Sequence, residues 1–535
     1  DYGIFKSMNS GETWTKVNNI GVEKGQGRIM LSINKNNPNK IYGLISDTFH
    51  SLFFIRSNDL LNNITIHSIP DIASYQGWYV KGIISNQDGK EVLIGGVDLF
   101  LDKTGKFNSF VRFQMGDIGL HSDFHDIIAN PNDAAKVYFA TDGGIFRSDD
   151  FGRSFYSCNS GLNTSQFYSA SFTDNGDFGI GGLQDNRSAI YSGTTNWILT
   201  HLGDGTSSAI NTLDKNIIFC SSQNLYLSKS IDKGKNWTNK LIDPEACFVT
   251  PFKMSPSNEN VLYTGSTKLY KSTDNGNHFT TVSLMPDSVV INTIEVSSIN
   301  SEFLLLSSLP NIISKPKLYK SLDGGKTLIN ITSTLPDRII SDICIIDNLE
   351  YIVSLTGFGT DHIYRTLDGG LSWFSIDSNL PDIPIHTIWV SPFNPDLIFA
   401  GSDLGLYFSD NKGKNWRSIN PNGIDAISIY DLVYIKNERT LAILTHGRGA
   451  YKIDPFGEIL NTETKTKRKF VTQNFYTSDN LPLELLKQSQ GQLFNMNGQL
   501  INMVKNNLAE VFSNITSGVY LYNSQNTTFK ILKYN

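Results

Sequence analysis

Long apolar runs are absent from this sequence of 535 residues. No segment holds the roughly 18 consecutive apolar residues that a membrane-spanning helix needs, so the sequence predicts no such helix. Segments with a convincing 3.6-residue apolar period are also lacking, apart from one weak case near the C-terminus. The missing 3.6-residue period argues against a helical fold.

Cysteine is scarce, and the four residues Cys158, Cys220, Cys247 and Cys344 are widely scattered without a CxxC pair. This spacing argues against a zinc site and against a disulfide scaffold. It predicts four buried free thiols, with a single disulfide as the alternative. The net charge of −6 is mild and implies no basic face, which excludes nucleic acid as the expected partner.

Aromatic residues (11%) and 44 glycines are present instead, in short hydrophobic runs broken by Asn, Asp, Gly and Ser. This pattern favours an all-β fold. A chain of this length is too long for one ordinary core, so we expect several domains or one large repeat array.

One pattern does recur: an apolar strand followed by Ser/Thr-x-Asp/Asn-x-Gly-x-x and a large apolar residue, usually Trp or Phe. Clear copies span residues 7–14, 148–155, 230–237, 272–279, 321–328, 366–373 and 409–416. From Gly234 to Gly413 the glycines are spaced by roughly 42 to 49 residues, a period typical of propeller blades. Decayed copies begin at Ser57, Asp102 and Ser192. The Asp predicts an Asx-type turn, the Gly a left-handed position, and the aromatic residue a contact between sheets.

This pattern resembles the Asp-box, or BNR, repeat of sialidases, sortilin-type receptors and xyloglucan-degrading double-propeller glycosidases. The resemblance covers roughly residues 3–453 and implies a β-propeller whose boxes are scaffold on the outer rim. The segment Thr440–Ile453, with THGRG at its centre, resembles the closing unit of such proteins. We therefore expect a partial propeller of about four blades at 1–159 and a seven-bladed propeller at 160–455. A single ten-bladed ring is the alternative.

Because Gly3–Ser7 lies in mid-repeat, the sequence also predicts that the chain is a fragment of a longer precursor.

After Pro455 the composition becomes polar and charged, which predicts a linker at 456–475. Short strands follow, at Gln492–Ile501 around an Asn497-Gly498 turn and as a second pair at 515–522 and 528–533. Residues 476–535 resemble the type A C-terminal sorting domain of type IX secretion, and are expected to form a small β-sandwich with Leu493, Val519, Leu521 and Ile531 in its core. The resemblance assigns the signal to Asn497, Gly498, Gly518, Val519, Tyr520, Lys530 and Lys533. It implies export to the cell surface or medium through the outer membrane, with the type IX translocon and its shuttle protein as partners.

The most chemically suggestive run is His121-Ser122-Asp123-Phe124-His125. On a strand, His121, Asp123 and His125 share one face and form a candidate ligand or divalent-metal site, with a hydrogen-bonded inner strand as the alternative. No other cofactor is expected. Gln184, Asp185, Asn186 and Asp204 lie in glycine-rich turns of the following blades. They are candidate ligand-binding residues, because strand ends of successive blades could converge; simple Asx turns are the alternative.

The resemblance also implies a second functional hypothesis, glycoside hydrolysis. Asp142, in TDGGIFR, matches a catalytic position of the xyloglucan-degrading relatives, and Asp403, in GSDLGLYFS, matches one more weakly. Two such carboxylates would act as general acid and base on either side of the scissile bond. We expect first a secreted or cell-surface propeller that binds a glycan or protein ligand, and second a glycoside hydrolase.

Overall fold

The computed structural model describes residues 3–18, 27–113, 119–201, 203–419 and 427–457, together with five strands between 476 and 533. They form two compact units, Asp1–Ile453 and Asp454–Asn535. Apart from one 3₁₀ turn, η2 (Pro286–Ser288), the regular structure of the described residues consists of strands, and no helix among them is long and apolar enough to cross a bilayer. The all-β prediction is confirmed.

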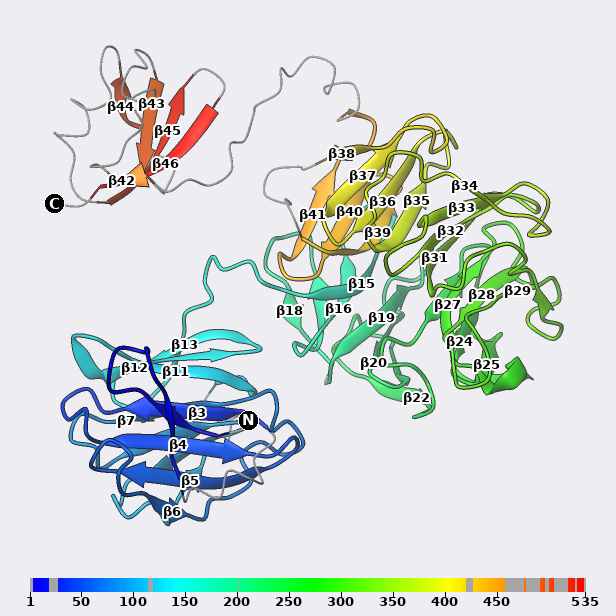
Figure 1. Ribbon diagram of the computed structural model, residues 1–535. Coiled ribbons are helices and arrows are strands. Elements are labelled where there is room, and N and C mark those ends of the chain that lie inside the picture. The colour runs from blue at the N-terminus through cyan, green and yellow to red at the C-terminus, as the bar shows by residue number, and fades with distance from the viewer. Residues whose placement is uncertain are drawn as a thin grey trace. The chain divides into compact units, whose positions relative to one another are not determined.

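The first group of sheets begins with a hairpin and continues with three four-stranded antiparallel sheets (Figure 1). The hairpin pairs β1 (Phe5–Lys6) with β2 (Thr15–Lys16). The three sheets are β3 (Ile29–Ile33), β4 (Ile41–Ser46), β5 (Ser51–Ser57) and β6 (Thr65–His67); β7 (Gly82–Ser85), β8 (Val92–Gly95), β9 (Leu99–Asp102) and β10 (Val111–Arg112); and β11 (Phe124–Asn130), β12 (Asp133–Thr141), β13 (Gly144–Ser148) and β14 (Tyr156–Ser157).

The second group holds six four-stranded sheets and a final three-stranded one. In chain order these are β15 (Phe167–Phe172), β16 (Gly179–Leu183), β17 (Ser188–Tyr191) and β18 (Ile198–Leu199); β19 (Gly205–Ile210), β20 (Ile218–Ser222), β21 (Tyr226–Ser230) and β22 (Thr238–Ile242); β23 (Phe252–Ser255), β24 (Asn258–Gly265), β25 (Lys268–Ser272) and β26 (Thr280–Leu284); β27 (Ile291–Val296), β28 (Leu304–Ser308), β29 (Leu318–Ser321) and β30 (Ile329–Asn330); β31 (Ile340–Ile345), β32 (Tyr351–Leu355), β33 (Ile363–Thr366) and β34 (Phe374–Ser375); β35 (Ile385–Val390), β36 (Ile398–Ser402), β37 (Gly405–Ser409) and β38 (Arg417–Ile419); and β39 (Ile429–Ile435), β40 (Thr440–Thr445) and β41 (Ala450–Ile453).

The first strands of these seven sheets pack against one another in chain order, and β39 packs against β15. Phe167 and Leu183 of the first sheet share a core with Ile435 and Leu444 of the last. Sheets that stack face to face in this way bury both faces, as in a β-propeller. The assignment of residues 1–159 to a separate, partial ring stays a prediction, since both groups belong to the unit Asp1–Ile453.

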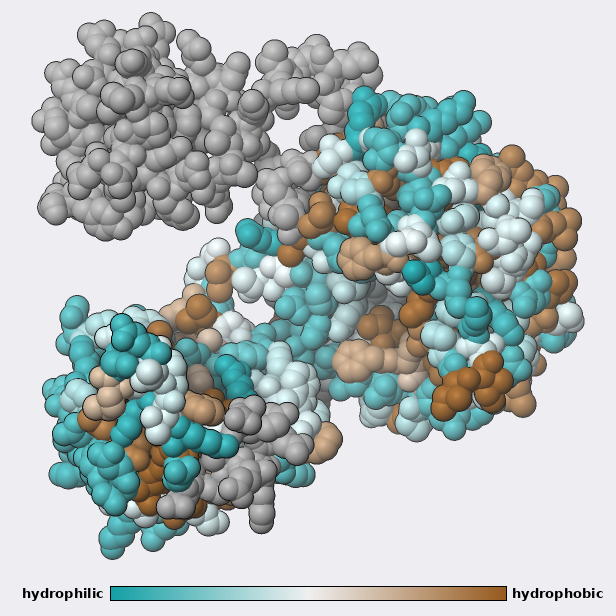
Figure 2. All heavy atoms as spheres, in the orientation of Figure 1, coloured by the Kyte–Doolittle hydropathy of each residue, from teal (hydrophilic) through white to brown (hydrophobic). Residues whose placement is uncertain are grey.

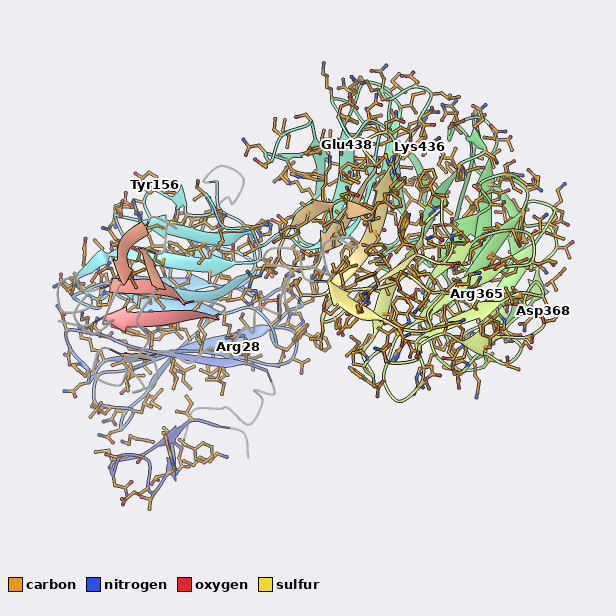
Figure 3. The ribbon with its side chains drawn as sticks, turned by 90° about the horizontal axis from the view of Figure 1, so that it is seen from above. Arg28, Tyr156, Arg365, Asp368, Lys436 and Glu438 are labelled. Carbon is orange, nitrogen blue, oxygen red and sulfur yellow. The ribbon has the colours of Figure 1, made fainter. Side chains whose placement is uncertain are left out.

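The Asp-box at Thr366 shows why the repeats fold as they do. The Thr366 hydroxyl accepts a hydrogen bond from the Gly370 N–H (3.0 Å) and donates to Asp368 Oδ1 (2.7 Å), which also accepts from the Ser372 N–H (3.0 Å). Gly370 has φ 93°, and a Cβ there would come within 2.8 Å of Ile331. Figure 3 shows Asp368 at the periphery of its sheets. The bond from the Gly N–H to the Ser or Thr hydroxyl occurs in all the clear boxes.

In two boxes the tryptophan that ends the motif is buried in the core. Trp373 is 7% exposed and donates from Nε1 to the carbonyl oxygen of Ile331 in the preceding sheet (2.9 Å). Trp416 repeats this contact with Ile376 (2.8 Å). The box is thus a local turn that fixes an inter-sheet contact. Trp14, in the hairpin, is the exception at 62% exposed.

Hydrophobic residues on the visible surface of the unit Asp1–Ile453 form several separate groups among hydrophilic ones (Figure 2).

All four cysteines are free, as predicted, but only Cys220 is buried. Cys158 is exposed, and Cys247 and Cys344 are half-buried. The prediction of four buried thiols was therefore wrong. Cys158 follows the outer strand β14, whose residues face solvent.

The C-terminal unit contains one five-stranded sheet in the order β42-β46-β45-β43-β44. Its strands are β42 (Tyr476–Thr477), β43 (Gly491–Asn495), β44 (Leu500–Val504), β45 (Gly518–Ser524) and β46 (Thr527–Lys533). The two predicted strand pairs are present, and Leu493 is fully buried. Asn497, Gly498 and residues 458–475 lie outside the described residues, as do the side chains of Val519, Leu521 and Ile531. The second sheet that a sandwich requires is not among the described residues.

Candidate functional site

A histidine and an aspartate from neighbouring strands of one sheet form the centre of the candidate site. His125 lies in β11, and Asp142 follows β12, which pairs with β11. His125 Nε2 lies 2.5 Å from Asp142 Oδ1. The Tyr79 hydroxyl donates to the same oxygen at 3.3 Å, and the Tyr79 ring packs edge-on against the His125 ring at 4.7 Å. One carboxylate oxygen is therefore held by an imidazole and a phenol.

The predicted alternation of His121, Asp123 and His125 on one strand face is wrong. Of the three, only His125 lies in β11, because the strand begins at Phe124. Asp123 has φ 63°, in the left-handed region, which turns the backbone and breaks the period of two. His121 is directed elsewhere, with Nδ1 3.0 Å from the Ser122 carbonyl oxygen and Nε2 2.9 Å from the Asp185 carbonyl oxygen. Among the described residues no group of three or more His, Cys, Asp or Glu side chains is placed to hold a metal ion.

Three further aspartates, Asp123, Asp185 and Asp204, lie beside this pair, and together with Asp142 we call them the carboxylate cluster. Burial and the nearby Asp142 carboxylate raise the pKa of Asp123 to about 6. Burial, together with the Asp204, Asp142 and Asp123 carboxylates, raises the pKa of Asp185 to about 6. Burial also raises the pKa of Asp204. The structure thus brings three of the predicted site residues into mutual electrostatic contact with Asp142.

The amide residues of the GGLQDN turn connect this cluster to the closing segment of the propeller. Asn186 Nδ2 donates to the backbone carbonyl oxygens of Asp142 (3.0 Å) and Gln184 (3.1 Å). Gln184 Oε1 lies 2.9 Å from both the Tyr168 hydroxyl and His446 Nε2. The Gln184 side chain therefore bridges the first and last sheets of the second group.

Four rings form a second feature, the aromatic cluster of Tyr168, His386, Tyr430 and His446. Tyr430 stacks on His386 at 4.5 Å and lies 4.4 Å from His446, which in turn lies 5.1 Å from Tyr168. His386 Nε2 lies 2.7 Å from Asp403 Oδ1, which also accepts from the Ser428 hydroxyl at 2.9 Å. Burial lowers the pKa of His446. Asp403 is thus paired with histidine in the same manner as Asp142.

Exposed aromatic side chains lie beside Tyr79. The Trp78 ring contacts the Tyr79 ring at 5.1 Å and is 59% exposed, and Tyr75 is 68% exposed. The backbone of this loop is fixed, since Trp78 N–H donates to the Thr48 carbonyl oxygen (3.0 Å) and Arg28 Nη1 to the Tyr79 carbonyl oxygen (2.7 Å). A rigid loop that holds exposed rings loses little entropy when a ligand binds.

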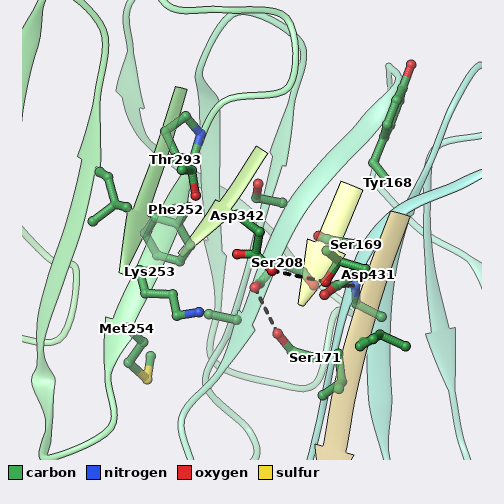
Figure 4. Close-up of a pocket in the computed structure, with 18 of the residues that line it drawn as sticks. Tyr168, Ser169, Ser171, Ser208, Phe252, Lys253, Met254, Thr293, Asp342 and Asp431 are labelled. Atoms are coloured by element: carbon green, nitrogen blue, oxygen red, sulfur yellow. Dashed lines mark hydrogen bonds between the residues drawn. The ribbon is translucent and has the colours of Figure 1, made fainter. Parts of the chain in front are cut away.

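A cavity of about 1,090 Å³ runs between the first strands of the second group (Figure 4). Its polar side chains are engaged in contacts between neighbouring strands. Asp431 Oδ2 accepts from the Ala170 N–H (3.1 Å), Asp342 Oδ2 accepts from the Ile388 N–H (2.9 Å), and the Lys253 ammonium lies 2.6 Å from Glu295. Lys253 lines the cavity, and Lys253 and Glu295 keep 41% and 22% of their side-chain surface accessible. These residues join the sheets, whereas Tyr168, His386 and Tyr430 also line this cavity and belong to the candidate site.

Sequence reasoning missed Tyr79, Trp78, Tyr168, His386, Tyr430 and His446 as site residues. Tyr168, His386 and Tyr430 lie on strands, where aromatic residues are usually core, Trp78 and Tyr79 lie in a loop without a motif, and His446 lies in the THGRG segment, which was interpreted as structural. One signal was available: both paired histidines precede their aspartates by the same interval, His125 before Asp142 and His386 before Asp403, each at the second position of a first strand.

No known family model matches the chain, and no curated protein does. Solved structures with a similar fold include a GH74 enzyme from Niastella koreensis (12% identity, 85% of this chain and 95% of that chain, TM-score 0.26). The GH74 xyloglucanase from Xanthomonas campestris is similar at 10% identity over 84% of this chain and 94% of its own, with a TM-score of 0.29. YCF48 bound to a D1 peptide is similar at 13% identity over 54% of this chain and 93% of its own, with a TM-score of 0.42. At these levels the likeness concerns the β-propeller fold alone.

Proposed function

We propose that the protein binds a glycan at the face formed by Trp78, Tyr79, His125 and Asp142. The observation that carries this proposal is the exposed Trp78 ring against Tyr79, whose hydroxyl reaches the carboxylate that His125 holds. Sugars present apolar C–H faces that pack on aromatic rings, and hydroxyls that donate to carboxylates. Exposed aromatic rings beside a few fixed polar groups are typical of ligand binding.

A glycan array tests this proposal. Residues 1–457 are expected to retain one class of glycan, and Trp78→Ala together with Asp142→Ala to lose it. Ile312→Ala, at a fully exposed apolar residue outside the site, serves as the control. A protein ligand at this face is the other binding hypothesis, and it is favoured if the array is blank while surface proteins compete for the same residues.

Glycoside hydrolysis is the second candidate function. The observation that favours it is the repeated pair, in which Asp142 and Asp403 each lie within hydrogen-bond distance of a histidine. Paired carboxylates can act as general acid and base on a glycosidic bond. A screen for new reducing ends with bound glycans, repeated with Asp142→Asn and Asp403→Asn, separates hydrolysis from binding. Product formation by the wild type that both variants abolish would establish catalysis.

We further propose that residues 476–535 act as the sorting signal of type IX secretion, which would place the propeller on the cell surface or in the medium. The support is the residue pattern of the tail together with its sheet, in which β46 pairs with both β42 and β45. The translocon and its shuttle protein are the proposed partners.

A further inference from the structure

A buried histidine ends the loop between β32 and β33, which spans residues 356–361 and which we call the His362 loop. His362 is 1% exposed. Its backbone N–H donates to Asp377 Oδ2 (2.9 Å), and its Nδ1 lies 3.4 Å from the same oxygen. On the other side of the ring, Nε2 lies 3.1 Å from the Gly357 carbonyl oxygen and 3.4 Å from Asp382 Oδ1. Both ring nitrogens therefore face acceptors.

This arrangement suits the protonated form of His362. A neutral imidazole carries one N–H and can donate on one side only, whereas the imidazolium carries two and donates on both. Its positive charge also compensates Asp377, which is 5% exposed and whose Oδ1 is buried without a partner. A buried carboxylate needs a counter-ion, and in the described part of the chain His362 is the basic side chain that pairs with it.

Further contacts hold the His362 loop against its neighbours. The Gly359 N–H donates to both carboxylate oxygens of Asp382 (2.9 and 3.0 Å), and Arg338 Nη2 donates to the Phe358 carbonyl oxygen (2.8 Å). The Phe358 side chain is 61% exposed, and Thr356 lines the cavity of the second group of sheets. The loop therefore connects an exposed aromatic residue with the cavity wall.

We propose that His362 is a pH-sensitive clamp, whose protonated form holds the His362 loop in the observed conformation and whose neutral form releases it. The charged groups that face the ring are the carboxylates of Asp377 and Asp382. Arg338 and the exposed Asp361 are the other charged groups at the loop. Burial lowers the pKa of His362, but the two carboxylates and the backbone acceptor raise it by more, so the net shift is upward from the ordinary value of 6.5. The clamp is therefore complete below about pH 6.5 and is lost as the pH rises through the raised pKa.

Hydrogen exchange of the wild-type chain tests the clamp, with mass spectrometry between pH 6 and pH 9 and correction for the intrinsic exchange rate. We expect the protection of the Gly359 N–H to fall roughly five-fold or more across this range, with a midpoint above pH 6.5. The segment 309–314, in the corresponding loop of the neighbouring sheet, contains no histidine and is the internal control. Its corrected protection should stay constant. Constant protection of the His362 loop as well would overturn the inference.

Three variants separate the clamp from a purely structural role. His362→Gln cannot gain the proton, so it should show at both pH 6 and pH 9 the low protection of the wild type at pH 9. Asp382→Asn keeps an acceptor for the Gly359 N–H but lacks the charge, so its midpoint should lie below that of the wild type. Asp361→Asn removes a carboxylate of the same loop, leaves Asp377 and Asp382 in place, and should keep the wild-type midpoint.

Retained pH dependence in His362→Gln, or an unchanged midpoint in Asp382→Asn, would overturn the inference. If His362→Gln fails to fold, titration of the His362 ring by NMR in the wild-type chain replaces it. A midpoint above pH 6.5 that coincides with the loss of protection is the expected result. A midpoint at or below pH 6.5 would overturn the inference.

Discussion

His125 Nε2 lies 2.5 Å from Asp142 Oδ1, and this contact joins the first strand of a sheet to the turn that follows its second strand. The arrangement recurs between His386 and Asp403 in another sheet (2.7 Å). In both sheets the histidine lies at a register shift near the start of the first strand, and the aspartate follows the second strand. The scaffold therefore offers the same histidine–aspartate contact in two blades, and the residue types at these positions decide whether it forms.

The Asp-boxes should contribute to stability and leave binding unaffected. In Thr366→Ala the Gly370 N–H loses its acceptor at a buried position. We expect a loss of about 1 kcal/mol in the free energy of unfolding, by analogy with other side-chain caps. Thr366→Ser keeps the hydroxyl used by the other boxes and should be close to wild type. Thermal melting with glycan titration measures both effects; an unchanged melting temperature with lost binding would show that the box is not scaffold.

Asp431 should make stability depend on pH. Burial raises its pKa to about 7, above the ordinary value near 4 in the unfolded chain. The folded state then holds the extra proton between these values, so the contribution of Asp431 is full below about pH 4 and is lost as the pH rises through about 7.

Asp431→Asn removes this titration while its side-chain oxygen can still accept from the Ala170 N–H. The variant should melt near wild type at pH 4 and above wild type at pH 8. Melting curves across this range decide the matter, and a difference between the proteins that stays constant with pH would contradict the raised pKa.

Gln184 should position the aromatic cluster. Its Oε1 faces the Tyr168 hydroxyl and His446 Nε2, and Gln184→Leu would leave both without this acceptor. We expect several-fold weaker glycan binding and altered pH dependence of binding, because the His446 environment changes. Gln184→Glu restores an acceptor and should recover part of the affinity. Wild-type binding by both variants would show that the bridge is only structural.

The sequence predicted the sheets well because each Asp-box is a local signal: Thr366, Asp368 and Gly370 make their turn within a few residues. Asp142, Asp185 and Asp204 were predictable for the same reason, since all lie in glycine-rich turns. Tyr79, Tyr430 and His446 were not, because their role arises from contacts between sheets far apart in sequence. The failure at His121 and Asp123 has a single cause, the left-handed backbone of Asp123, which a period of two does not reveal.

The final strand should be essential for export. β46 lies between β42 and β45, so deleting residues 529–535 would remove an interior strand of the sheet and leave an open edge. In the native host we expect the truncated protein to be retained in the cell. Lys530→Ala with Lys533→Ala tests direct recognition with the strand intact. Normal amounts of the truncated protein in the medium would refute the sorting role.

The central claim is that the Asp142 carboxylate contacts the ligand, and the dissociation constant of Asp142→Asn for the glycan retained on the array tests it most directly. Asp150→Asn, which alters an Asp-box carboxylate in the same sheet, is the matched control. The account predicts at least a roughly ten-fold weaker affinity for Asp142→Asn, because a charge-assisted hydrogen bond is lost, and an unchanged affinity for Asp150→Asn. Equal affinities of the wild type and Asp142→Asn would contradict it.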